Sequence, residues 1–198
     1  MIGQERRHGM DLNLATVSAM VRETLTRPHE AAARLLAMNV PDDARWLGFV
    51  IVVVLSVLLG QVSVLGMGEN GFGGGMLFMA MFQTSVLLGM VVAVQGIGRA
   101  LGGAGTFPDT LLLIAWLQFV MLVFQLAQIV ALFLIPPLFG MIAVAALVVF
   151  LWMLTQFVLV LHGFTSPVKV FVGIIFSFFG VAMLMAIVLA IFGVGANV

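Results

Sequence analysis

Five long apolar stretches dominate the pattern of this chain, and polar or turn-forming residues separate them. None of the five contains Asp, Glu, Lys or Arg. A helix needs about 20 apolar residues to cross a bilayer, and each stretch reaches that length. The predicted spans are 46–66, 75–97, 111–134, 138–161 and 170–192. The pattern therefore predicts an all-α polytopic membrane protein with five transmembrane helices, preceded by short amphipathic helices.

Turn and capping signals divide these spans. Pro136-Pro137 cannot continue a helix, because proline lacks the amide donor and clashes with the preceding turn, so we expect a tight hairpin there. Gly102-Gly103-Ala104-Gly105 is expected to be a flexible connection. Helix-start signals precede the first, third and fifth spans: Asp42-Asp43, the capping box Thr106-Phe107-Pro108-Asp109, and Ser166-Pro167.

The chain divides into an amphipathic cytoplasmic segment, residues 1–45, and a transmembrane domain, residues 46–198. Apolar residues in the first segment recur at three- and four-residue steps, with Asp11 as an N-cap and a break at Pro28. Two short helices follow from this pattern, the second with an i,i+4 pair of Glu30 and Arg34. They can form a platform for lipids or partners, or they can pack on the end of the bundle.

Composition and charge narrow the class of protein. The chain is 63% hydrophobic and 8% charged, whereas soluble domains carry about 25% charged residues. A soluble enzyme or nucleic-acid binder is therefore excluded. All the basic residues precede the first span or follow the second or fourth, which predicts a cytoplasmic N-terminus and a C-terminus on the opposite side. Candidate contacts to lipid or a partner are Arg22, Arg27, Arg34, Arg45, Arg99 and Lys169.

The spans offer no chemistry of the kinds that membrane enzymes and pumps use. They contain no ionisable side chain, so a carboxylate proton relay and a paired-aspartate site are not expected. The chain has no cysteine. We expect no enzymatic activity, no catalytic residue, no cofactor and no metal. His162, at the end of the fourth span, is expected to be a hydrogen-bonding boundary residue instead of a ligand.

Uncharged polar residues inside the spans allow two interpretations. Glutamine side chains should face protein or trapped water, because lipid offers no hydrogen-bond partner. They can line a groove for a lipid head group or small solute, or they can join helices by hydrogen bonds. The residues of this candidate polar groove are Gln83, Gln118, Gln125, Gln128 and Gln156.

Small residues predict helix contacts at two places. Gly89 and Ala93 lie one turn apart in the second span. The fifth span has two small-residue faces, one formed by Gly173, Ser177 and Gly180 and the other, roughly opposite, by Ala182, Ala186 and Ala190. Such faces permit close approach of two backbones. The fifth span is therefore expected to be central in the bundle or to serve an oligomer contact.

Three short motifs resemble those of a known family. They are Arg27-Pro28 ahead of the first span, Gly102-Gly103-Ala104-Gly105-Thr106-Phe107 before the third, and His162-Gly163-Phe164-Thr165-Ser166 before the fifth. With the five-span layout they make the chain similar to the bacterial branch of the Yip-domain family, the Ypt/Rab-interacting membrane proteins. The resemblance implies a bacterial inner-membrane location. Eukaryotic members are linked to vesicle traffic, Rab-type GTPase association and membrane shaping, and the family offers no catalytic residues.

One family motif is absent. Eukaryotic members carry Asp-Leu-x-Gly-Pro before the first span, whereas this chain has Pro41-Asp42-Asp43-Ala44-Arg45-Trp46. GTPase association of the eukaryotic members is therefore not inferred for this chain.

Two functions from different classes follow. The leading hypothesis is a non-enzymatic protein that organises partner proteins or lipids in the membrane, or an accessory subunit of a larger complex. Its expected partners are membrane lipids and either another protein or a second copy of the chain. No nucleic acid is expected, because eight basic residues balance eight acidic ones. The alternative is a small transporter, channel or lipid-translocating protein with a glutamine-lined, uncharged pathway.

Overall fold

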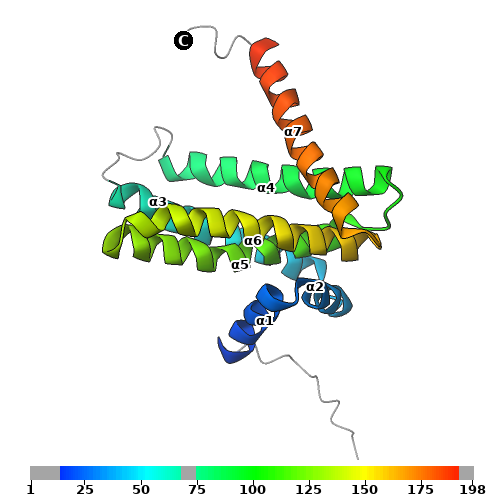
Figure 1. Ribbon diagram of the computed structural model, residues 1–198, viewed down its shortest axis with the longest axis horizontal. Helices are drawn as coiled ribbons and strands as arrows, with labels where there is room; N and C mark the ends of the chain where they lie inside the picture. The colour runs from blue at the N-terminus through cyan, green and yellow to red at the C-terminus, as the bar shows by residue number, and fades with distance from the viewer. Residues whose placement is uncertain (1–13, 68–74, 192–198) are drawn as a thin grey trace, which may run out of the picture.

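The computed structural model describes residues 14–67 and 75–191, with a continuous account of side chains from 15 to 67 and from 75 to 180. The secondary structure of this part of the chain consists of α-helices joined by short turns and loops, and the described residues contain no strand (Figure 1). Its helices are α1 (Leu14–Thr26), α2 (Pro28–Ala37), α3 (Asp42–Gly66), α4 (Gly75–Ala100), α5 (Phe107–Leu134), α6 (Pro137–His162) and α7 (Pro167–Ile191).

The predicted capping residues explain where the long helices begin. The Thr106 hydroxyl accepts a hydrogen bond from the Asp109 amide, 3.3 Å away, and so caps α5. The Ser166 hydroxyl caps α7 in the same way, with 3.4 Å to the Lys169 amide nitrogen. The Pro136-Pro137 hairpin is confirmed, since α5 ends at Leu134 and α6 begins at Pro137. Asp11 lies outside the described residues.

Helices α3 to α6 lie side by side and form an up-and-down bundle (Figure 1). Helix α5 is central, because it packs against α3, α4 and α6. The innermost side chains come from all four helices and are at most 2% exposed: Phe49, Val91, Leu117, Met153 and Phe157. All four are long and apolar enough to cross a membrane. The chain is an integral membrane protein with four candidate spans among the described residues.

The fifth predicted span does not join this bundle. Helix α7 diverges from the other long helices after its first turns (Figure 1). Val170 and Ile174 are its buried positions, and α6 is its main neighbour. The apolar stretch of α7 whose side chains are continuously described, Pro167–Gly180, is shorter than a span. A central place for this helix is therefore wrong for the described chain, and its crossing of the membrane stays a prediction.

Helices α1 and α2 pack against the side of the bundle. Helix α2 contacts α6 and α5 through Ala31, Ala32 and Leu35, and α1 lies on α2. The predicted pair of Glu30 and Arg34 is wrong. Arg34 instead pairs with Glu23 of α1 at 2.9 Å, because the two helices pack together. Glu30 pairs with Arg27 at 3.4 Å.

Candidate functional site

The charged residues of the bundle gather at one of its two ends. Helices α3, α5 and α7 begin there, and α4 and α6 end there (Figure 1). We call this the charged end. Every Asp, Glu, Lys or Arg of α3 to α7 lies within four residues of it: Asp42, Asp43, Arg45, Arg99, Asp109 and Lys169.

Arg45 ties the start of α3 to the start of α5. Its Nη1 lies 3.0 Å from Asp109 Oδ1, and its Nε donates to the Val40 carbonyl oxygen over 2.8 Å. The other Asp109 oxygen accepts from the Thr106 hydroxyl at 2.6 Å. The Arg45 side chain is only 11% exposed. Arg45 was predicted as a lipid or partner contact, and its guanidinium is instead engaged by groups of this chain.

His162 is the buried polar residue at the junction of α4, α5 and α6. It is the last residue of α6 and is 3% exposed. The Gly105 amide donates to its Nδ1 over 3.2 Å, so Nδ1 must carry a lone pair. In the neutral ring the proton then lies on Nε2, which faces the Val94 carbonyl oxygen at 3.2 Å. The ring also stacks on Phe164, with 5.4 Å between centroids. His162 thus acts as the predicted hydrogen-bonding boundary residue.

Three glycines make room for the imidazole ring. A Cβ atom at Gly98, Gly103 or Gly105 would overlap His162 atoms; for Gly105 the distance to His162 Cε1 would be 2.7 Å. Gly98 follows Val94 by one helical turn, so a side chain there would crowd the carbonyl that the ring reaches. The glycine-rich segment was expected to be a flexible connection. The structure shows that Gly103 and Gly105 of this segment pack closely against His162.

Two helix ends of the same kind meet at this junction. Helix α4 ends in a Schellman motif, in which Gly103 N bonds to Gly98 O and Gly102 N bonds to Arg99 O. Gly102 has a φ of +86°, which glycine adopts without strain. Helix α6 ends in the same way around Gly163, which has a φ of +69°. Two of the three motifs that resemble the Yip-domain family, residues 102–107 and 162–166, are therefore packed against each other. We call this arrangement the His162 junction.

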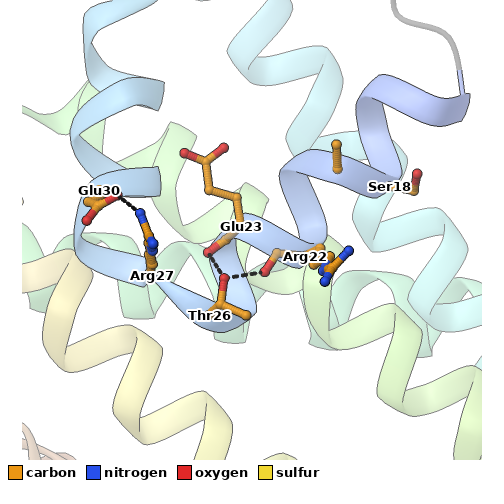
Figure 2. Close-up of a pocket in the computed structure, with 7 residues that line it drawn as sticks. Ser18, Arg22, Glu23, Thr26, Arg27 and Glu30 are labelled. Carbon is orange, nitrogen blue, oxygen red and sulfur yellow. Dashed lines mark hydrogen bonds and ion pairs between the residues drawn. The ribbon is translucent and has the colours of Figure 1, made fainter.

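An open groove lies at the bend between α1 and α2. Its volume is about 640 Å³, and Figure 2 shows the residues that line it. Arg27 turns toward Glu30, whereas Arg22 points away from both (Figure 2). Beside the groove, the fully buried Thr24 hydroxyl accepts a hydrogen bond from Trp116 Nε1 at 3.0 Å. This bond fastens α1 to α5.

The candidate polar groove does not assemble as one unit. Gln118 Nε2 donates to the Ser56 hydroxyl at 3.1 Å, and Gln125 Nε2 donates to the Ser56 carbonyl at 3.0 Å. These two glutamines therefore join α5 to α3. Gln83, Gln128 and Gln156 are half-buried and make no hydrogen bond to another described side chain or backbone group.

The six predicted contact residues separate into two groups. Arg27, Arg34 and Arg45 each hold an ion pair within the chain. Arg22, Arg99 and Lys169 are exposed, and none has an ion pair with another described residue. Sequence reasoning did not identify the buried hydrogen bond of Thr24 or the three glycines that pack around His162. The glycine spacing was the signal that could have identified this packing, because glycine tolerates close approach.

Comparison with known proteins gives one family. A family model described as the Yip1 domain matches residues 22–192. The match includes the last five residues of α1, all of α2 to α7, and both motifs of the His162 junction. No curated protein and no solved structure matches the chain.

Proposed function

The chain belongs to the Yip1 domain family, and from this premise we propose that it is a non-enzymatic membrane protein that organises partner proteins or lipids. We place its charged end in the cytoplasm of a bacterial cell, at the inner membrane. It acts alone, as a homo-oligomer or as an accessory subunit of a larger complex. This reading goes beyond family membership and the membrane location.

One observation carries the proposal: the charged side chains of the described chain all lie at the charged end or on α1–α2. Ion pairs join helices there, and three cations remain exposed without an acidic partner. The bundle core, in contrast, is filled with apolar side chains. A protein built in this way can present a fixed surface to partners at the membrane boundary, while its spans hold that surface in place.

Site-specific photo-crosslinking in native membranes tests this function. Ala19 of α1 and Ala33 of α2 are exposed, and Leu77 near the opposite end is 74% exposed and serves as control. A photoreactive amino acid at Ala19 or Ala33 should yield discrete adducts with a protein or a phospholipid. Leu77 lies on a candidate span and can react with phospholipid, so only protein adducts are compared at this position. Similar protein adducts from Leu77, or no adducts from the two alanine positions, would contradict the proposal.

The proposed orientation can be tested with single cysteines, because the chain has none of its own. In intact cells, Ala33→Cys should be protected from a membrane-impermeant thiol reagent, and Leu77→Cys should react. The reverse pattern would place the charged end outside the cytoplasm.

The alternative, a transporter or lipid-translocating pathway lined by glutamine, has one supporting feature. Gln83, Gln128 and Gln156 are half-buried and lack hydrogen-bond partners among the described residues. The bonds of Gln118 and Gln125 to Ser56 count against it, since they use two of the five groups for helix packing. Solute or lipid flux in liposomes that fell when Gln83, Gln128 and Gln156 were replaced by Leu would favour this pathway.

A further inference from the structure

The exposed cations Arg99 and Lys169 both lie at the charged end, each close to the terminus of its helix. Arg99 is the penultimate residue of α4, and Lys169 is the third residue of α7. The His162 junction links these two ends, because Gly98 packs on the imidazole ring and α7 follows it after a short loop. Packing at the His162 junction therefore holds the backbone beside both cations in place.

Each cation has an exposed aliphatic neighbour. Leu101 follows Arg99 and is 66% exposed, and Val168 precedes Lys169 and is 69% exposed. An apolar side chain beside a cation at a helix end suits the boundary between acyl chains and phosphates. Helix α4 has 26 residues; at 1.5 Å per residue it is about 39 Å long, which exceeds a hydrocarbon core of about 30 Å. The helix is therefore long enough for its last turn to lie at the phosphate level.

Acidic side chains do not neutralise this pair. Within the described chain, Glu23 and Glu30 pair with Arg34 and Arg27, and Asp42 and Asp109 pair with Arg45. Asp43, at the start of α3, is exposed and forms no ion pair with Arg99, Lys169 or any other described cation. Helix stability does not explain Lys169 either, since a cation in the first turn opposes the helix dipole. The two cations are therefore available to an anion outside the chain.

We propose that Arg99 and Lys169, with Leu101 and Val168, form a binding patch for the head groups of anionic phospholipids. The cations bind lipid phosphates, and the aliphatic side chains contact the upper acyl chains. A zwitterionic lipid fits less well, because the patch has no acidic group for its ammonium. This inference rests on the proposed function and deepens it, by naming a lipid class and reducing six candidate residues to two.

Native mass spectrometry of the full chain in mild detergent tests the patch. Phosphatidylglycerol and phosphatidylcholine with the same acyl chains serve as probes. A basic residue near the surface strengthens binding of anionic lipid about fivefold, so two should give a preference of about 25-fold for phosphatidylglycerol. Arg99→Gln and Lys169→Gln should each remove about fivefold, and the double variant should bind both lipids about equally.

The matched control is the double variant Arg27→Gln, Arg34→Gln, which removes the same charge from residues that hold ion pairs. It should keep the preference. Arg99→Lys with Lys169→Arg should also keep it, which guards against an effect of misfolding in the glutamine variant. No preference in the wild type, or equal loss in the control, would overturn the patch. Persistent crosslinks from Ala19 and Ala33 in that case would leave the broader function standing.

Discussion

Two sets of glycines in this chain lie in opposite surroundings. At the charged end, Gly98, Gly103 and Gly105 leave no room for a Cβ, because the His162 ring fills the space. On α4 and α7, Gly89, Gly173 and Gly180 face open space, and a Cβ at any of them would meet no atom within 4 Å. The predicted helix contacts through these last three glycines are therefore wrong within the described chain.

The difference shows what lipid and water each require of a fold. An apolar helix face in a bilayer needs no protein neighbour, since acyl chains are as apolar as leucine. Helix ends are different, because their last backbone groups must find hydrogen-bond partners. At the charged end, two Schellman motifs and the His162 ring bond to such backbone groups, and an ion pair joins the starts of α3 and α5. Specific contacts therefore concentrate where the chain leaves the hydrocarbon.

The largest expected effect is that of Gly98→Ala. The added methyl group would displace the His162 ring and break its two hydrogen bonds, at a cost of about 3 kcal/mol in the free energy of unfolding. Titration with sodium dodecyl sulfate in mixed micelles measures this quantity. A loss below about 0.5 kcal/mol would mean that the ring does not occupy this position.

His162→Ala should cost about 2 kcal/mol, because it leaves the Gly105 amide without its partner. Combined with Gly98→Ala, it should give a strongly non-additive result, since the methyl group then occupies space that the ring has vacated. The double-mutant cycle is the measurement. Additive costs would show that the two residues do not contact each other.

Arg45→Gln should cost about 1–2 kcal/mol, because it breaks an ion pair whose arginine is 11% exposed and whose aspartate is 30% exposed. Exposure of Asp109 reduces the effect from that of a fully buried pair. Arg27→Gln, in which the exposed pair to Glu30 is lost, is the control and should change unfolding by less than about 0.5 kcal/mol. Equal losses of unfolding free energy for Arg45→Gln and Arg27→Gln would show that the pair of Arg45 contributes no more than an exposed ion pair.

Gln118→Leu should cost about 0.6 kcal/mol, the average for a hydrogen bond between membrane helices. The change removes the bond to Ser56. Gln128→Leu is the control, because Gln128 has no hydrogen-bond partner among the described residues. A larger cost for Gln128 than for Gln118 would point to a partner outside this chain.

Gly89→Ala should have the smallest effect and should not destabilise the protein. The site has room for a methyl group, and alanine favours a helix over glycine by up to about 1 kcal/mol. Thermal unfolding in detergent measures the change. Loss of a homo-oligomer on size-exclusion chromatography, with a stable monomer, would show that Gly89 contacts a second copy.

The sequence predicted the helices more successfully than their neighbours. Apolar length identified α3 to α6, and local capping signals identified their ends, as at Thr106 and Pro137. Such signals act over a few residues and are visible in one dimension. The partner of Arg34 and the divergence of α7 depend on how distant helices pack, and helical spacing alone gave the wrong answer for both.

By itself, the sequence determined that this is an all-α membrane protein with its charge excluded from the hydrocarbon, because burying charge in lipid is costly. It also contained the motifs of the Yip1 domain family. Only the tertiary structure brought His162 to Gly98 and Gly105, and Arg45 to Asp109, across 57 to 64 positions of chain. The packing of whole helices determines such contacts, and no local sequence pattern contains the information that would predict them.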